Sequence, residues 1–589
     1  MATVQMQAPT QDFHQQASAL RPETRMVING KLVDAISGQR FETFNPANDE
    51  ALSSVPLGDA EDVDLAVASA RAAFRSGVWS RLEPRARMQV MYRMADLITQ
   101  NSLRLGLMDS VNVGKPIADM LSANGDVAAA ALTFRFFGEA IDKIEGAVTT
   151  TAPNAFHYIV RQPIGVVACI APWNYPLLIA AWKVAPALAI GNSVILKPAQ
   201  ISPFSATLLG QLFLEAGGPP GVFNVVHGTG GTVGKALALH RDVNKISFTG
   251  STDIGKMMMV YSGQSNLKRV TVETGGKSPQ IITANVPDLD IAVDYAVNGI
   301  YGNKGEMCSA GSRLLVDARI HDDFVEKFKA RTRETIRIGD PLDTATTMGP
   351  LASRNQQKNV LSEISLATQE GAKLALGGQT PEGFDRGAYV EPTLFTDVNN
   401  RMRIAREEVF GPVAAVLSFE TIDEAVAIAN DKTAFAAHRP VCHQIEDHAG
   451  AGLAPMMVFE IAGHRSLWVM RAVPDIVDDG ALGQEFGAHP VVQRIEFALA
   501  EEAARDAGLI GEEEDKIAGV VQAADRLGCI GHPADPVVAA HIAVVVVDDA
   551  VAVEECGGPG RGIDTAHNRS DSRIRVCSIS SQMACRTVI

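Results

Sequence analysis

The chain has 589 residues, of which 46% are hydrophobic, and a formal net charge of −16. This acidic balance argues against nucleic acid as a general partner, and we expect no membrane span because no run of about 18 apolar residues occurs. The first residues lack the apolar stretch of a signal peptide, so we expect a cytoplasmic protein. The seven cysteines show no regular spacing, which is typical of a reducing compartment, where a lone thiol is more often catalytic or buried than disulfide-bonded.

The N-terminal part of the chain combines a polar arm with helical segments. Residues 1–25 are polar and predict a disordered arm, and an ordinary α/β composition then extends from residue 26 to about residue 432. Apolar residues at helical spacing predict helices over 62–77 and 85–101.

Short apolar runs and helices alternate in the next part of the chain. The runs at 165–173 and 193–198 are rich in β-branched residues and suit buried parallel strands. The apolar segment 177–192 lies between them and predicts a helix that ends at Gly191. Because a similar alternation recurs over 221–251, the sequence predicts an α/β fold with a doubly wound sheet.

From about residue 433 the composition changes abruptly. The final 157 residues hold five of the seven Cys and eight of the thirteen His, but one Lys, one Asn and no Tyr. This bias is what an out-of-frame reading of a GC-rich gene would give. A genuine extra domain is the alternative, because 494–510 has the pattern of an amphipathic helix.

Cys308 lies in a loop of small residues, "YGNKGEMCSAGSRL", just before an apolar run. Oxidation of an aldehyde by a nicotinamide cofactor needs a nucleophile, because hydride leaves a tetrahedral hemithioacetal far more readily than a bare aldehyde. Such a thiol should be exposed and its pKa held down. A cysteine in a loop is, taken alone, more often structural than catalytic.

Other segments place polar residues that suit the same chemistry. Asn174 follows an apolar strand in "IAPWNYP", Glu273 precedes two glycines in "VETGGKSPQI", and Glu408 lies in "EEVFGPV". The turn "FTGSTDIGK" resembles a phosphate cradle at a helix N-terminus. In this order, and together with Cys308, these segments resemble the aldehyde dehydrogenase superfamily over residues 26–432.

The resemblance implies a mechanism for each of three residues. Cys308 would be the nucleophile, and Asn174 would stabilise the oxyanion together with the backbone N–H of Cys308. Glu273 would activate the water that hydrolyses the thioester. The alternative interpretation of Glu273 is a solvated acid on the surface. The family usually has Leu after this Glu, whereas this chain has Thr274.

The resemblance also implies a site for NAD or NADP. Gly250 and Ser251 would meet the pyrophosphate, and Gly255 would allow close packing of the following helix. Many members that prefer NAD have Glu three residues after the lysine that binds the adenosine ribose, but this chain has Gln200 after Lys197, so NADP is a candidate as well as NAD. Other residues expected to line the cofactor cleft or the substrate tunnel are Glu408, Phe410, Trp173 and Trp182. The alternative for either tryptophan is an ordinary place in the hydrophobic core.

The implied architecture is a Rossmann-type NAD(P)-binding domain over 26–144 and 161–274, with an oligomerisation-type β segment over 145–160. A catalytic domain over 275–432 would follow, incomplete because the family's later segments do not occur in 433–589. Family members are commonly homo-oligomers, which this departure puts in doubt here. The implied function is NAD(P)-dependent oxidation of an aldehyde to a carboxylic acid through a hemithioacetal and a thioester. The alternative is a catalytically impaired or dead nucleotide-binding homologue.

Three segments look functional but have plainer interpretations. The glycine-rich run 228–234 lacks dinucleotide-fingerprint spacing and predicts a turn near the adenine. Cys169 lies within an apolar strand and should be buried and inert. The segment 442–448, "CHQIEDH", has no four-ligand spacing, so we expect no metal site.

Overall fold

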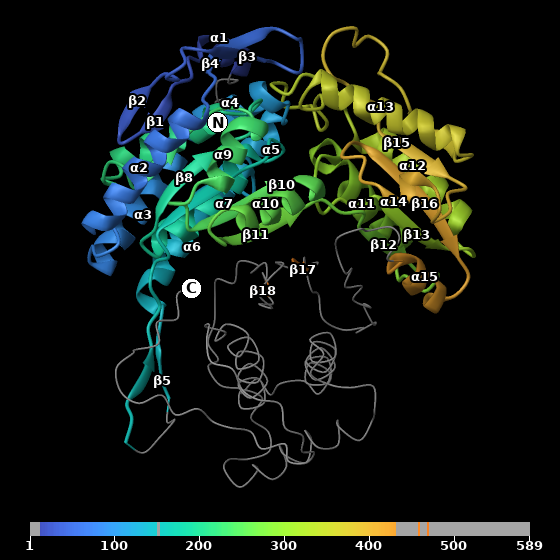
Figure 1. Cartoon of the computed structure of the whole chain (residues 1–589). Helices are drawn as coiled ribbons and strands as arrows, with labels where there is room; N and C mark the ends of the chain where they lie inside the picture. The colour runs from blue at the N-terminus through green and yellow to red at the C-terminus, as the bar shows by residue number, and fades with distance from the viewer. Residues whose placement is uncertain (1–11, 150–153, 432–457, 460–467, 470–589) are drawn as a thin grey trace, which may run out of the picture. The chain divides into compact units, whose positions relative to one another are not determined.

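The computed structural model of the chain describes residues 12–149, 154–431, 458–459 and 468–469 (Figure 1). All of them fall in one compact unit of the chain. No helix within these ranges is long and apolar enough to cross a membrane. The predicted tail, 433–589, lies outside the described residues except for two short strands that pair with each other, β17 (Val458–Phe459) and β18 (Trp468–Val469).

The first large sheet has seven strands in the order β11-β10-β7-β8-β9-β1-β2. Its parallel part consists of β7 (Val166–Ile170), β8 (Ser193–Lys197), β9 (Phe223–Val225), β10 (Lys245–Gly250) and β11 (Arg269–Thr274). Two antiparallel strands extend its edge, β1 (Met26–Ile28) and β2 (Lys31–Val33).

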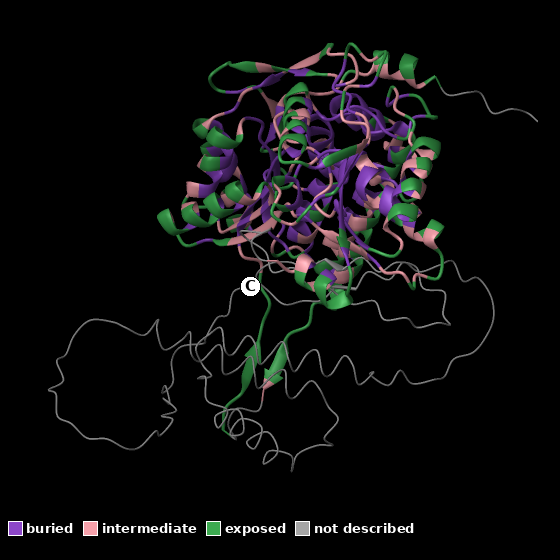
Figure 2. Cartoon of the chain, turned by 90° about the vertical axis from the view of Figure 1, so that its right-hand side faces the viewer, coloured by how far each residue is buried: buried purple, intermediate pink, exposed green. Residues whose placement is uncertain are grey.

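Helices cover both faces of this sheet, because alternate residues of each strand point to opposite sides. Val167 and Cys169 of β7 belong to one core, whereas Val166, Ala168 and Ile170 belong to the other. The first core is closed by α3 (Pro84–Gln100), α4 (Ser102–Val113), α6 (Asp126–Ala140), α7 (Pro176–Ala189) and α8 (Phe204–Glu215). The second is closed by α2 (Ala60–Ser76), α9 (Lys235–Leu239) and α10 (Thr252–Gln264). The predicted doubly wound sheet is therefore confirmed, and Figure 2 shows its buried interior.

The second large sheet has five strands in the order β12-β13-β16-β15-β14. The parallel strands are β12 (Pro279–Ile282), β13 (Arg313–Asp317), β16 (Val413–Phe419) and β15 (Thr393–Thr396), and β14 (Lys373–Leu376) runs antiparallel at one edge. One face packs on α11 (Leu289–Tyr301) and α12 (His321–Thr335). The other packs on α13 (Arg354–Gln369), α14 (Arg403–Arg406) and α15 (Ile422–Ala429).

Smaller elements complete the described part of the chain. Two hairpins are formed by β3 (Arg40–Phe44) with β4 (Ala51–Pro56), and by β5 (Ala147–Thr149) with β6 (His157–Ile159). The short helices are α5 (Ile117–Leu121), η1 (Ile141–Lys143), η2 (Gly230–Gly234) and η3 (Gly302–Gly305). The β5–β6 hairpin falls within the segment predicted as an oligomerisation strand, and its residues are almost all exposed (Figure 2).

The prediction of a disordered arm over 1–25 is wrong for part of that segment. Residues 13–19 form α1 (Phe13–Ala19), and the Asp12 side chain caps it by accepting a hydrogen bond from the backbone N–H of Gln15 at 2.9 Å. Phe13, Ala17 and Leu20 pack against the first core. Their spacing puts them on one helix face, so this short helix gains apolar contacts that the polar composition of the arm concealed.

Candidate active site

The loop that carries Cys308 begins in a tight left-handed stretch after α11. Asn303, Lys304 and Gly305 have φ of 46°, 63° and 69°. A Cβ on Gly305 would lie 2.0 Å from the carbonyl oxygen of Gly411, so this position requires glycine for both its conformation and its close approach. Cys308 follows in a turn and is partly exposed.

The surroundings of Cys308 favour the neutral thiol rather than the thiolate. Burial raises its pKa above the ordinary value, and the charges of Glu408 and Glu273 raise it further. The backbone amides of Ser309 and Cys308 act in the opposite direction. The expectation that the loop itself holds the pKa down is therefore wrong for the cofactor-free chain, because burial and then the charges of Glu408 and Glu273 oppose ionisation of the thiol.

Asn174 is joined directly to the Cys308 loop. It follows β7, precedes α7 and is 3% exposed. Its Nδ2 donates to the carbonyl oxygen of Glu306 at 2.9 Å. Because a carboxamide has two N–H donors, this bond fixes the orientation of the group and leaves a second donor for another acceptor.

Glu273 lies near the end of β11, opposite Thr249 of β10, and is partly buried. Its charge acts on Cys308 and also on Lys183 of α7. Lys183 is buried, and that burial lowers its pKa to about 8. The charge of this carboxylate therefore opposes ionisation of the thiol and favours protonation of the buried amine.

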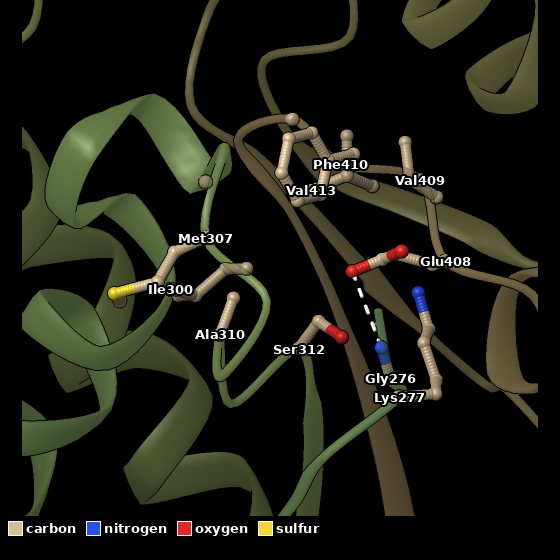
Figure 3. Close-up of a pocket in the computed structure, with 12 residues that line it drawn as sticks. Gly276, Lys277, Ile300, Met307, Ala310, Ser312, Glu408, Val409, Phe410 and Val413 are labelled. Atoms are coloured by element: carbon tan, nitrogen blue, oxygen red, sulfur yellow. Dashed lines mark hydrogen bonds between the residues drawn. The ribbon is translucent and has the colours of Figure 1, made fainter. Parts of the chain in front are cut away.

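Glu408 borders a small pocket at the base of the Cys308 loop (Figure 3). The backbone N–H of Gly276 donates to its Oε1 at 3.3 Å. The residue is exposed on one side, but the protein around the carboxylate raises its pKa to about 7 through desolvation. Figure 3 shows Lys277 pointing toward this carboxylate, and its buried Nζ has no hydrogen-bond partner within the described residues.

Two aromatic residues connect the first sheet with the loop of Glu408. The rings of Trp173 and Phe410 lie 5.2 Å apart at an interplanar angle of 88°. Trp173 directly precedes Asn174, and Phe410 follows Glu408 by two residues. Trp182, the other tryptophan predicted for this region, is 48% exposed and is not part of the core.

The predicted cofactor residues lie at the carboxyl ends of the parallel strands of the first sheet, where ligands bind in doubly wound folds. Lys197 ends β8, Gly250 ends β10, and Ser251 is the N-cap of α10. Ser251 makes no side-chain cap hydrogen bond, so the first N–H groups of α10 are open to an anion. Gln200 lies at the same edge in a turn after β8.

These residues fit a dinucleotide on two structural grounds. Lys197 Nζ is buried and donates to the carbonyl oxygen of Pro198 at 2.7 Å, which leaves N–H groups for a ribose hydroxyl. A Cβ on Gly255 would lie 2.9 Å from Thr274 Cγ2, so glycine here lets α10 approach β11. No hydrogen bond or ion pair recorded for the described residues joins Gln200 or Ser251 to the Cys308 loop.

Two of the three segments with plainer interpretations, Cys169 and the glycine-rich run 228–234, lie within the described residues. Cys169 is buried, as expected, and burial raises its pKa to about 12, which disfavours the reactive thiolate. Gly234 ends a π-helical turn, and a Cβ there would lie 3.9 Å from Lys197 Cδ. The segment 442–448 lies outside the described residues, and within the described ones no cluster of three His, Cys, Asp or Glu could hold a metal.

Sequence reasoning missed two residues that the structure places beside Asn174. Lys115 Nζ donates to the carbonyl oxygen of Asn174 at 3.1 Å, and Asn303 Nδ2 donates to the same oxygen at 3.2 Å. The one signal in the sequence for Lys115 is a lysine between a glycine and a proline directly after an apolar helix. Asn303 gave no signal beyond its place near Cys308.

Comparisons with known proteins find relatives over most of the described part of the chain. The sequence model of the Aldehyde dehydrogenase family matches residues 32–441. Aldehyde dehydrogenase 1 of Tanacetum cinerariifolium is 45% identical over 410 residues, which cover 70% of this chain and 81% of that protein. The structure of P. syringae AldA, an indole-3-acetaldehyde dehydrogenase in complex with NAD+ and IAA, is 48% identical with a TM-score of 0.70. The aldehyde dehydrogenase KauB from Pseudomonas aeruginosa is 49% identical with a TM-score of 0.70, and each match covers 71% of this chain and 84% of the other.

Proposed function

This chain belongs to the aldehyde dehydrogenase family, and we propose that it oxidises an aldehyde through a covalent intermediate on Cys308. The observation that carries this proposal is the convergence of Asn174, Glu273 and Glu408 on the Cys308 loop. Asn174 is bonded to that loop, and the two carboxylates act electrostatically on the sulfur. These residues come from both large sheets, so the fold itself assembles the site.

NAD or NADP is the cofactor, and Lys197, Gly250, Ser251 and Glu408 are the residues that would hold it. Similar solved structures support NAD in particular, since one of them contains NAD+. When bound, the cofactor accepts the hydride that leaves the aldehyde carbon. Gln200 carries no charge, so nothing at that position repels a 2′-phosphate, and we propose that NADP is also used.

Acylation begins when the thiol of Cys308 loses its proton to solvent water and Sγ attacks the carbonyl carbon. A C–S bond forms and the carbonyl oxygen becomes an oxyanion. The second N–H of Asn174 Nδ2 and the backbone N–H of Cys308 donate to that oxyanion. In comparable sites one such donor lowers the barrier by about 3–4 kcal/mol. Loss of hydride from the same carbon then leaves a thioester on Cys308.

Glu273 is proposed as the base of the second half of the reaction. Its carboxylate takes a proton from water, the resulting hydroxide attacks the thioester, and the C–S bond breaks to release the carboxylic acid and the thiolate of Cys308. Glu273 then returns its proton to that thiolate, which restores both groups. Lys183 lies within the electrostatic reach of Glu273, whose charge raises the pKa of that lysine against the larger effect of burial. Cys308 acts in both halves of the cycle, first as the nucleophile and then as the leaving group, whereas Glu273 acts in the second half.

The β5–β6 hairpin supports a proposal about assembly. Val148, Phe156 and Tyr158 are 66%, 78% and 57% exposed, and a short two-stranded hairpin with exposed apolar residues has unpaired edges. We propose that it pairs with another copy of the chain, as the resemblance to homo-oligomeric family members implies.

The test separates acylation from deacylation. In Glu273→Gln, mass spectrometry of protein mixed with NAD and propanal or benzaldehyde should detect an acyl group on the peptide that contains Cys308. Cys308→Ala is the matched control and should carry none. Binding of NAD by calorimetry without any acyl group would contradict the proposal and support a catalytically dead nucleotide-binding homologue.

A further inference from the structure

We infer that Lys115 is a positioning residue for the oxyanion site: its ammonium fixes the backbone of Asn174 and the side chain of Asn303, and so holds the Cys308 loop in register with the Asn174 carboxamide. The inference rests on the proposed function, because Lys115 acts through Asn174 and Cys308 rather than on the substrate.

Lys115 is held firmly from several sides. It follows Gly114, the left-handed C-cap of α4, and is 3% exposed. Its Nζ donates to the carbonyl oxygen of Asn174 at 3.1 Å and to Asn303 Oδ1 at 3.0 Å. The ammonium also forms an ion pair with Asp126 Oδ2 at 2.9 Å. It lies 3.5 Å from the ring centroid of Tyr175, a cation–π contact that adds a further restraint.

The partners of Lys115 bond to one another and to the loop. Asn303 Nδ2 donates to the carbonyl oxygens of Asn174 and Glu306, at 3.2 and 3.0 Å. Asn174 Nδ2 donates to the same Glu306 oxygen at 2.9 Å. Glu306 precedes Cys308 by two residues. These bonds form a closed network in which one carbonyl oxygen, that of Glu306, holds both asparagine amides beside the thiol.

A charge at position 115 matters more than its bulk in this arrangement. Without the ammonium, Asn303 Oδ1 loses its donor and Asp126 loses its partner in a mostly buried place. The Asn303 carboxamide is then free to turn, and Asn303 is held in a left-handed conformation that its surroundings must stabilise. A shift of about 1 Å in a reacting group costs about a hundredfold in rate.

The test compares Lys115→Met with Lys268→Met. Lys268 is also a buried lysine that donates to a backbone carbonyl, that of Ala238, and it lies before β11 at the end away from Glu273. With propanal and NAD in rapid mixing, Lys115→Met should reduce the rate of the first burst of reduced cofactor about a hundredfold. Its Kd for NAD, measured by calorimetry, should stay within about twofold. Lys268→Met should leave both values unchanged.

Asn303→Gly is the second variant, in case Lys115→Met does not fold. Glycine adopts the φ of 46° readily, so this change removes the carboxamide while keeping the backbone and Lys115. It should show the same loss of burst rate with an unchanged Kd for NAD, and the double variant should lose no more than either single one.

The outcomes distinguish this inference from the proposed function. A burst in the unsubstituted chain that persists at the same rate in folded Lys115→Met, or in Asn303→Gly, would overturn the positioning role alone. No burst in the unsubstituted chain, despite NAD binding, would overturn the proposed function and this inference with it. A parallel loss of NAD binding in Lys115→Met would show a general structural role and would also overturn the inference.

Discussion

Replacing Lys304 with methionine should destabilise the Cys308 loop to an extent that grows with pH. Lys304 Nζ lies 3.3 Å from Glu306 Oε2, and the two side chains are 1% and 0% exposed. Lys304 also donates to the carbonyl oxygen of Val113 at 3.0 Å, and Glu306 Oε1 accepts the N–H of Ala352 at 3.0 Å. The substitution therefore leaves a fully buried carboxyl group without its countercharge.

The size of the effect follows from the pKa of Glu306. Burial raises that pKa to about 7, and burial lowers the pKa of Lys304. Because the pKa of Glu306 is higher in the folded than in the unfolded chain, its contribution to stability is present at low pH and is lost as the pH rises through about 7. Without Lys304 the pKa of Glu306 rises further. The folded chain then keeps this carboxyl protonated at pH values at which the unfolded chain ionises it. At about 1.4 kcal/mol per pH unit, the deficit should grow by about 2 kcal/mol between about pH 5.5 and about pH 8.5.

Native-state hydrogen exchange measures this deficit in the loop itself. The opening free energy of a peptide spanning 299–312 should differ little between Lys304→Met and the unsubstituted chain at the lower pH. At the higher pH its protection should be about thirtyfold weaker. Lys304→Met combined with Glu306→Gln is the matched control, because it removes the ionisable group and should remove the pH dependence. A deficit of equal size at both pH values, or a pH dependence that survives in the double variant, would show that ionisation of Glu306 is not the cause.

Three further predictions follow from the cofactor edge and from the thiol. Gln200→Glu should lower kcat/KM with NADP by about tenfold through repulsion of the 2′-phosphate while sparing NAD; equal losses in steady-state assays with the two cofactors would contradict this. Gly255→Ala should weaken NAD binding in calorimetry, because the new Cβ meets Thr274 Cγ2 at 2.9 Å; Thr274→Ala should restore it, and no effect of either change would count against close packing of α10. The ordinary pKa of a cysteine thiol is 9.0, and burial and then Glu408 and Glu273 raise the pKa of Cys308 above it. The rate at which iodoacetamide alkylates Cys308 in the cofactor-free chain should therefore still rise at pH 9.0. Glu408→Gln should move that profile to lower pH, and a plateau below about pH 8 would contradict the charge assignment.

Much of the fold could be predicted from local patterns in the sequence. The apolar, β-branched runs that became β7 and β8 are buried at every position, and a run of that kind between helices has few other solutions. Gly250 and Ser251 could be placed at a strand end because the change from strand to helix is visible in the residues themselves. Helix α1 could not be predicted from the sequence, because three apolar side chains in a polar arm indicate a packed helix only when the core that they contact is known.

The candidate site was predictable in its chemistry but not in its electrostatics. Cys308, Asn174 and Glu273 could be named from their motifs, whereas the raised pKa of Cys308 depends first on burial and then on two carboxylates, both of which result from the fold. Lys115 and Asn303 are 188 positions apart, and no local pattern reports such a contact. Lys304 and Glu306 are a pair of charged residues in a loop, which would ordinarily be exposed; in the fold they are 1% and 0% exposed, and they bond to Val113 and Ala352, which are distant in the sequence.

Covalent chemistry on Cys308 can be followed by rapid-mixing absorbance of the reduced cofactor, with propanal or benzaldehyde and with NAD or NADP, in the full chain and in Cys308→Ala. We expect a burst followed by turnover in the full chain, and neither in Cys308→Ala although it still binds NAD. Turnover at a normal rate in Cys308→Ala would contradict covalent chemistry on Cys308.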